Sequence, residues 1–251
     1  MLWYKAWRES RTRFAIFAVT LVAFCFFAVL FRRRIQADGS AILPLLRAHD
    51  YNQYIYNVIY SGTLKGVFAL LTIFLGLGGL LRERRYRTAM FTLALPVSRL
   101  QLVATQMGVG LSELAVLSLV PAVLIPSLSA LVHQSYPLAQ ALHFSVLWFG
   151  CCSIIFAASF LLSVVLGGEY TAPVVCYVAL MLQSLSASWP ALRPYRLNLM
   201  WTMGEVERVH WDSQHNFLIS DPLAWARLLI MMLIALVLLA LAVRITKKQN
   251  F

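Results

Sequence analysis

The sequence predicts an all-α membrane protein, and three observations lead to this fold class. Of its 251 residues, 61% are hydrophobic and only 12% are charged, whereas soluble domains carry about 25% charged residues. The mean hydropathy is +0.75. The apolar residues form six runs, each close to the about 20 residues that a membrane-spanning helix needs. Half the usual charge suits a surface that faces lipid rather than water.

The first three spans follow from the first three apolar runs. Phe14–Phe31 comes after a basic, Trp-bearing amphipathic stretch and is not followed by a small-residue cleavage site, so we expect a retained helix and not a signal peptide. The second span is expected at about Tyr60–Leu81. The loop before it, residues 32–59, contains YNQYIYNVIY, and tyrosines in such numbers are typical of the membrane interface. The third span, about Leu102–Val132, is long enough to include a tilt or a cytoplasmic extension.

The other three spans are expected at about Ala141–Leu166, Thr171–Leu192 and Leu223–Ile245. Short loops join the third span to the fourth and the fourth to the fifth. The outer loop, residues 193–222, is rich in Trp, Tyr and Leu. We therefore expect part of it to pack as short amphipathic helices on the outer face. The whole chain, 1–251, is treated as a single transmembrane domain.

The loop charges favour cytoplasmic N- and C-termini, because Lys and Arg are enriched in cytoplasmic loops. That orientation puts twelve basic residues inside and seven outside. The triplet RRR at 32–34 counts against it, and we interpret these arginines as interfacial anchors of a long first helix. The basic residues lie at the ends of apolar runs and not along one soluble face, so the net charge of +11 reflects bilayer topology and not nucleic-acid binding.

The four cysteines, Cys25, Cys151, Cys152 and Cys176, all lie inside apolar runs. Buried cysteine behaves as a small hydrophobic residue. The adjacent pair, 151 and 152, should point to different sides of its helix. We therefore expect neither disulfides nor a metal site.

The chain carries no sequence motif for its own catalysis. It has no G-x-x-x-x-G-K-[ST] phosphate-binding loop, no H-E-x-x-H and no G-x-S-x-G. Energy from ATP would have to come from another chain.

Ionisable residues inside apolar runs are costly and often functional. Glu113 in the third run is the clearest case, with two interpretations: a contact in a translocation path, or a polar group bonded to Ser or Thr of a neighbouring helix. For Lys65, Glu169, His133 and His143 we favour structural roles. Lys65 can extend to the headgroups, and Glu169 can cap the next helix. The two histidines have no evident third metal ligand.

Residues 82–102, RERRYRTAMFTLALPVSRLQL, are the most informative stretch. The arginines complement the helix dipole and the anionic inner leaflet. Behind them lies an amphipathic piece too short to span a membrane, so it must lie on the surface or pack against another protein. Pro96 would end this piece, and Ser98 is placed to cap the next helix, with Gln101 three residues later.

This segment resembles the R-E-R-x-x-x-T-…-L-x-x-P-V-S-R segment of the membrane subunits of ABC-2-type transporters. It stands here as Arg82-Glu83-Arg84, Thr88, Leu93 and then Leu95-Pro96-Val97-Ser98-Arg99. Arg87 occupies the position where the family usually has Gly. The length, the six expected spans and the outer region before the last span are also similar to that family. The chain looks most like stand-alone permeases encoded apart from their ATPase, including those of the multicopper-enzyme-maturation group.

The resemblance implies a function and a set of partners. Residues 82–99 would form a coupling helix that docks on a separate ABC ATPase, which binds ATP and Mg²⁺, while this chain holds no cofactor. Two permease copies, identical or different, and two ATPases would form an exporter in the cytoplasmic membrane. The docking candidates are Arg82, Glu83, Arg84, Thr88, Phe91, Pro96 and Arg99.

Two other functions stay open at this point. One is an intramembrane enzyme that uses Glu113, Glu169 or a histidine, although no paired acid and base motif supports it. The other is a scaffold that binds an ATPase and moves no substrate. The sequence does not distinguish between a drug, a lipid, a peptide and a copper- or sulfur-related species as cargo, although apolar helices mildly favour an amphipathic one.

Overall fold

The fold is a bundle of long apolar helices, which indicates a multi-pass membrane protein. The computed structural model describes residues 2–32, 51–77, 99–166, 171–186, 189, 198–204, 210–211, 217–218, 223 and 225–248. Within these ranges, five helical segments are long and apolar enough to cross a membrane.

The helix α9 (Thr171–Ser186) covers only part of the predicted fifth span. Its 16 residues reach about 24 Å, less than the about 30 Å of hydrocarbon in a bilayer. Six spans therefore stay a prediction.

The first helix, α1 (Leu2–Leu30), begins twelve residues before the predicted first span. The basic N-terminal stretch is thus continuous with the spanning helix. One stripe of α1 is buried or half-buried along its whole length, at positions 2, 6, 10, 13, 17, 21, 25 and 28. The spacing of three and four residues keeps these side chains on one face of a helix. That face packs against α7 and α4, introduced below.

The second span is broken and starts earlier than predicted. It consists of α3 (Tyr51–Ile55), the π-helical turn η2 (Tyr56–Tyr60) and α4 (Thr63–Leu75), separated by Ser61 and Gly62. A Cβ at Gly62 would overlap the carbonyl oxygen of Asn57, so the break requires glycine there.

The tyrosines expected in an interfacial loop are instead buried in the core. The Tyr54 hydroxyl donates to the Ala28 carbonyl of α1 over 2.9 Å, and the Tyr56 hydroxyl donates to the Gly204 carbonyl over 2.8 Å. The Tyr51 and Ser129 hydroxyls share a hydrogen bond of 2.5 Å. These three phenols have partners inside the bundle, so their rings can leave the interface at little cost. The hydroxyl of the fourth, Tyr60, is buried without a hydrogen-bond partner among the described residues.

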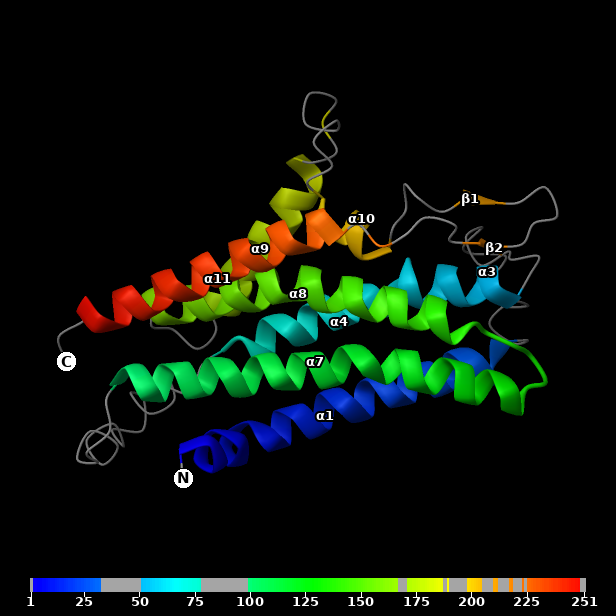
Figure 1. The fold of residues 1–251 in the computed structure, drawn as a ribbon, viewed down its shortest axis with the longest axis horizontal. Coiled ribbons are helices and arrows are strands. Elements are labelled where there is room, and N and C mark those ends of the chain that lie inside the picture. The colour runs from blue at the N-terminus through cyan, green and yellow to red at the C-terminus, as the bar shows by residue number, and fades with distance from the viewer. Residues whose placement is uncertain are drawn as a thin grey trace.

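The centre of the bundle is α8 (Leu138–Leu166), which packs against α7 (Arg99–Leu131), α4, α9 and α11 (Trp225–Lys248) (Figure 1). Buried residues occur on all sides of α8, as expected of a helix that is apolar all round. On α11, by contrast, large apolar side chains such as Leu229, Leu233 and Leu236 are exposed. In a bilayer these side chains face lipid.

The segment 193–222 contains a short helix as expected, α10 (Leu199–Gly204), but the expected position on the outer face is wrong: α10 packs inside the bundle, where Met203 is buried next to Cys152 in the middle of α8. The Asn198 side-chain oxygen accepts hydrogen bonds from the backbone N–H groups of Met200 and Trp201, which caps α10. The amide nitrogen of Asn198 donates to the Ser184 carbonyl at the end of α9. A pair of two-residue antiparallel strands, β1 (His210–Trp211) and β2 (Phe217–Leu218), follows and is a small departure from the all-α prediction.

All four cysteines are buried. The predicted divergence of the adjacent pair is confirmed. The Cys151 sulfur lies 3.7 Å from that of Met231 in α11, and the Cys152 sulfur lies 3.9 Å from that of Met203 in α10. These two thiols thus contact methionines of two different helices.

Both chain termini lie at the same end of the bundle (Figure 1). The start of α7 and the last turn of α11 are at this end too. The predicted topology puts both termini on one side of the membrane. Which side this is stays a prediction.

Substituting Gly76, at the end of α4, should lower stability. A Cβ there would lie 2.7 Å from the Ser159 Cβ and 2.8 Å from the Phe156 carbonyl oxygen of α8. Because a backbone atom cannot move aside easily, we expect Gly76→Ala to cost about 1–3 kcal/mol, measured by thermal unfolding in detergent. The matched control is Gly66→Ala on the same helix, where nothing lies within 4 Å of an added Cβ. Equal melting temperatures for the two variants would contradict this packing.

Substituting Tyr56 should loosen α10. Tyr56→Phe removes the hydroxyl that donates to the Gly204 carbonyl, and we expect a loss of about 1 kcal/mol. Hydrogen exchange of residues 199–204 should become faster. The control is Tyr177→Phe, whose side chain is 40% exposed on α9. Unchanged exchange in α10 would show that this bond does not hold it.

Candidate functional site

The predicted docking segment lies almost wholly outside the described residues. Arg82, Glu83, Arg84, Thr88, Phe91 and Pro96 belong to residues 78–98, of which the structure describes none. Arg99 is the first residue of α7. The docking role of all seven residues stays a prediction. The structure does describe the two helix ends to which this segment is attached.

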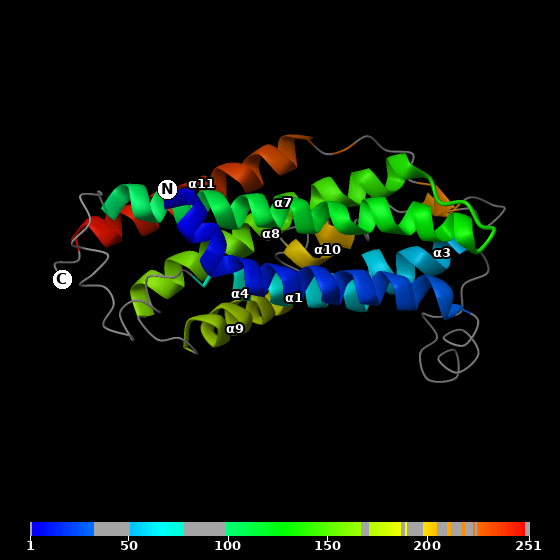
Figure 2. The same cartoon turned by 90° about the horizontal axis from the view of Figure 1, so that it is seen from below.

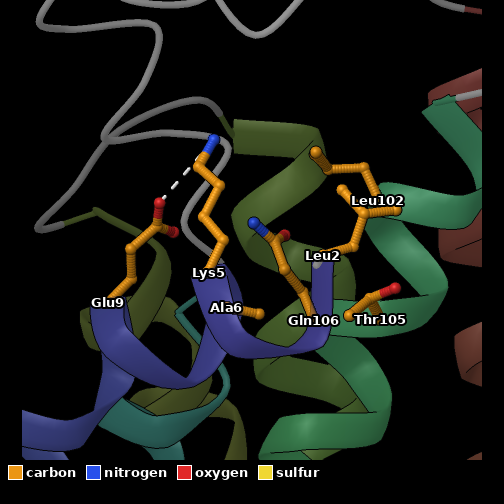
Figure 3. A pocket seen from close by; sticks show the side chains of 7 residues that line it. All are labelled: Leu2, Lys5, Ala6, Glu9, Leu102, Thr105 and Gln106. Carbon is orange, nitrogen blue, oxygen red and sulfur yellow. Dashed lines mark ion pairs between the residues drawn. The ribbon is translucent and has the colours of Figure 1, made fainter. Parts of the chain in front are cut away.

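The N-terminal turns of α1 contact both of these ends. The Arg13 guanidinium donates to the carbonyl oxygen of Leu77, two residues beyond α4, over 3.1 Å. On the other side, Leu2, Lys5, Ala6 and Glu9 of α1 line a small pocket together with Leu102, Thr105 and Gln106 of α7 (Figure 3). The Lys5 and Glu9 side chains form an ion pair of 3.8 Å at its rim. One short helical stretch thus bridges the residues before and after 78–98.

Glu113 lies in the same contact between α1 and α7. The Ser10 hydroxyl donates a short hydrogen bond to the Glu113 Oε1 atom, and the Arg13 charge is near enough to act on the carboxylate. The side chain is 2% exposed. Its other oxygen, Oε2, is buried and has no hydrogen-bond partner among the described residues.

The Glu113 contact agrees with the structural interpretation of that residue, in which it bonds to a serine of a neighbouring helix. Ser10 and Arg13 precede the apolar run of α1, so Glu113 meets α1 near the end of its spanning part. Its role in a translocation path stays a prediction.

The other ionisable candidates are dispersed. The Lys65 ammonium lies close to Gly204 at the end of α10, 3.3 Å from where a Cβ of that residue would be. His133 is exposed just beyond α7 with a φ of 55°, and the His143 ring meets Phe144 edge-on. Glu169 lies outside the described residues. In the part of the chain that the structure describes, no three His, Cys, Asp or Glu residues come together.

Ser10 and Arg13 are the site residues that sequence reasoning missed. A usable signal was present, because both fall on the stripe that continues from Leu2 and Ala6 into Phe17 and Leu21. Two polar residues on the buried face of a helix imply polar partners on its neighbour. Because the apolar run begins only at Phe14, hydropathy alone does not identify the first three turns as part of α1.

Comparison with known proteins adds no family to this geometry: no protein-family model matches the chain, and no curated protein is similar to it. The polar contacts described above connect helices to one another. They are part-buried and join α1, α7 and the end of α4.

Removing the Ser10 hydroxyl should weaken the contact between α1 and α7. Ser10→Ala leaves the buried Glu113 carboxylate without this donor, and hydrogen bonds to charged groups contribute about 1.5–3 kcal/mol. We expect a loss of about 2 kcal/mol in unfolding experiments in detergent. In the double variant with Glu113→Leu the two effects should not add.

Ser112→Ala is the control for this measurement. Ser112 is exposed on α7, and its hydroxyl donates to the Val109 carbonyl of its own helix. Its loss should change stability by less than about 0.5 kcal/mol. Strict additivity of Ser10→Ala and Glu113→Leu would show that the two side chains do not interact.

Proposed function

We propose that the chain is the membrane-spanning permease subunit of an ABC-2-type transporter, driven by ATP hydrolysis on a separate ATPase subunit. The observation that carries this proposal is the order of the motif pieces in residues 82–99 between the second and third spans. The chain itself is a transport subunit and not an enzyme, in keeping with a sequence without a phosphate-binding loop.

The placement of the helix ends supports this proposal. Residues 78–98 connect α4 to α7, and α7 begins at the end of the bundle where both termini lie (Figure 1). An ATPase bound there would meet one cytoplasmic face, which would include the C-terminal end of α11. That end of the helix carries Arg244 and Lys247. Cytoplasmic termini in the cytoplasmic membrane are part of the proposal.

The contacts of α1 suggest how docking would act on the helices. Any force on residues 78–98 reaches α4 through Leu77 and α7 through Arg99. Because Arg13 holds Leu77 and Ser10 holds Glu113, α1 would move together with both helices. From α7 the displacement passes to the central helix α8. In this scheme two permease copies, identical or different, alternate access to a path for export.

The test is binding and activation of an ATPase. The chain is co-expressed with the ATPase encoded nearest to its own gene, and the complex is purified through a tag on the permease. Replacing Arg82, Arg84, Arg85 and Arg87 by Ser should abolish co-purification, because docking would lose its positive charges. The matched control replaces Arg244, Lys247 and Lys248 by Ser, which removes charge at the same end from a different helix.

Three results would contradict the proposal in different ways. Binding retained by the arginine variant would remove residues 82–99 from the docking site. A complex whose ATPase activity no candidate cargo stimulates would favour a scaffold. Catalytic turnover by the chain alone, lost in Glu113→Gln, would favour an intramembrane enzyme.

A further inference from the structure

The first three turns of α1 present two different faces. The face toward α7 is the stripe described above, from Leu2 to Arg13. The exposed side of these turns carries aromatic and basic side chains at helical spacing, and its edge reaches α7, where the Trp3 ring lies 3.0 Å from where a Cβ of Gly108 would be. Its members are Trp3, Tyr4, Trp7, Arg8 and Arg11, all exposed, with 54% of Trp3, 68% of Tyr4 and 38% of Trp7 accessible. We name these five residues the aromatic–arginine face.

This face is continuous with the part of α1 that faces lipid. Along the same helix, the next large exposed side chains are apolar: Ile16, Val19 and Val22. The stretch from Phe14 to Leu30 has 17 residues, which cover about 26 Å and nearly match the about 30 Å hydrocarbon core. The turns before Phe14 therefore lie at the membrane surface. In Figure 2 the axis of these turns makes a steep angle with the axis of the rest of α1, and the turns cross α7 in this view.

The charges of the aromatic–arginine face are available to a ligand. Lys5 and Glu9 are paired with each other, and Arg13 donates to Leu77. Among the described residues, Arg8 and Arg11 have no hydrogen-bond or ion-pair partner. Two guanidinium groups one turn apart, flanked by Trp and Tyr, match the phosphate and glycerol level of a bilayer. Trp and Tyr rings settle there, and guanidinium binds phosphate through paired hydrogen bonds.

We propose that the aromatic–arginine face binds the headgroups of anionic phospholipids in the leaflet at this end of the bundle. Arg8 and Arg11 would bind the phosphates, and Trp3, Tyr4 and Trp7 would fix the depth of the helix. A membrane is favoured over a protein partner because the face continues directly into the lipid-facing stripe and carries a net positive charge. The binding does not require an ATPase, so it is independent of the proposed function.

Lipid binding would also position the candidate site. The other face of the same turns holds Leu77 through Arg13 and Glu113 through Ser10. Anionic headgroups on one side of α1 would thus keep both helix ends next to residues 78–98 at a constant depth. Without such lipid, the N-terminal turns would be held only by their contacts with α7 and with Leu77 after α4.

The experiment uses the full chain in nanodiscs of phosphatidylcholine and phosphatidylglycerol, mixed at one fixed ratio. In one sample only the phosphatidylglycerol carries bromine near the top of an acyl chain, and in the other only the phosphatidylcholine. Bromine quenches nearby Trp fluorescence. The difference between the wild type and Trp7→Phe isolates the signal of Trp7 from that of the other tryptophans.

We expect the quenching of Trp7 by brominated phosphatidylglycerol to correspond to a local concentration of this lipid roughly five-fold or more above its bulk concentration in the nanodisc. One surface arginine contributes about 1 kcal/mol to the binding of an anionic lipid, which is a factor of about five. High salt should reduce the enrichment. The double variant Arg8→Gln/Arg11→Gln should abolish it. The control Arg244→Gln/Lys247→Gln, at exposed positions of α11, should retain it. Equal melting temperatures of the variants check that they are folded.

Three outcomes would overturn the proposal. Equal quenching by both lipids in the wild type would mean that the face has no preference for anionic headgroups. Enrichment that survives in the Arg8 and Arg11 variant would assign it to other residues. Absence of Trp7 quenching by either lipid would mean that a protein, such as a second copy of the chain, covers the face instead.

Discussion

The second span is held in place by side chains that donate to backbone carbonyl groups, and the rest of the bundle depends on these bonds. Tyr54 donates to Ala28 of α1, Tyr56 donates to Gly204 of α10, and Ser159 of α8 donates to Ile73 of α4 over 2.7 Å. Inside a bilayer no water can replace a missing partner. The carbonyls of Ile73 and Gly204 lie in the last turns of α4 and α10, where a helix has no backbone partner for them, and the Ser159 and Tyr56 hydroxyls supply one.

The same constraint shapes the end of the bundle that holds the termini. Arg13 donates to the carbonyl of Leu77, which has left the helical pattern of α4, and Ser10 donates to the carboxylate of Glu113. Both donors come from a part of α1 that precedes its apolar run. The N-terminal turns thus have two faces, of which one is buried against α7 and the other is exposed at the surface. The proposed docking of an ATPase and the proposed lipid contact both involve these turns of α1, but neither proposal requires the other.

Much of the fold could be predicted, and the misses have identifiable causes. The long apolar runs locate α7, α8 and α11 to within a few residues, because hydrophobicity over about 20 residues suffices to define a span. The segment from Tyr51 to Tyr60 was expected at the interface, since a tyrosine ring with an unbonded hydroxyl prefers that region. Its burial depends on Ala28, Ser129 and Gly204, which lie far away in the sequence and which no local pattern identifies.

By itself, the sequence determined that this is a helical membrane protein, where most of its helices lie and that 82–102 is an unusual stretch between two of them. These properties depend on the composition of each segment and on the order of its residues, because the hydrophobicity of a segment decides whether it enters a bilayer. The tertiary structure alone decided that α1 extends over both ends of residues 78–98, that Glu113 bonds to Ser10 and that Cys151 and Cys152 meet different helices. Such pairings depend on which helices become neighbours, and a polar group in a bilayer is satisfied by whichever partner the packing brings within reach.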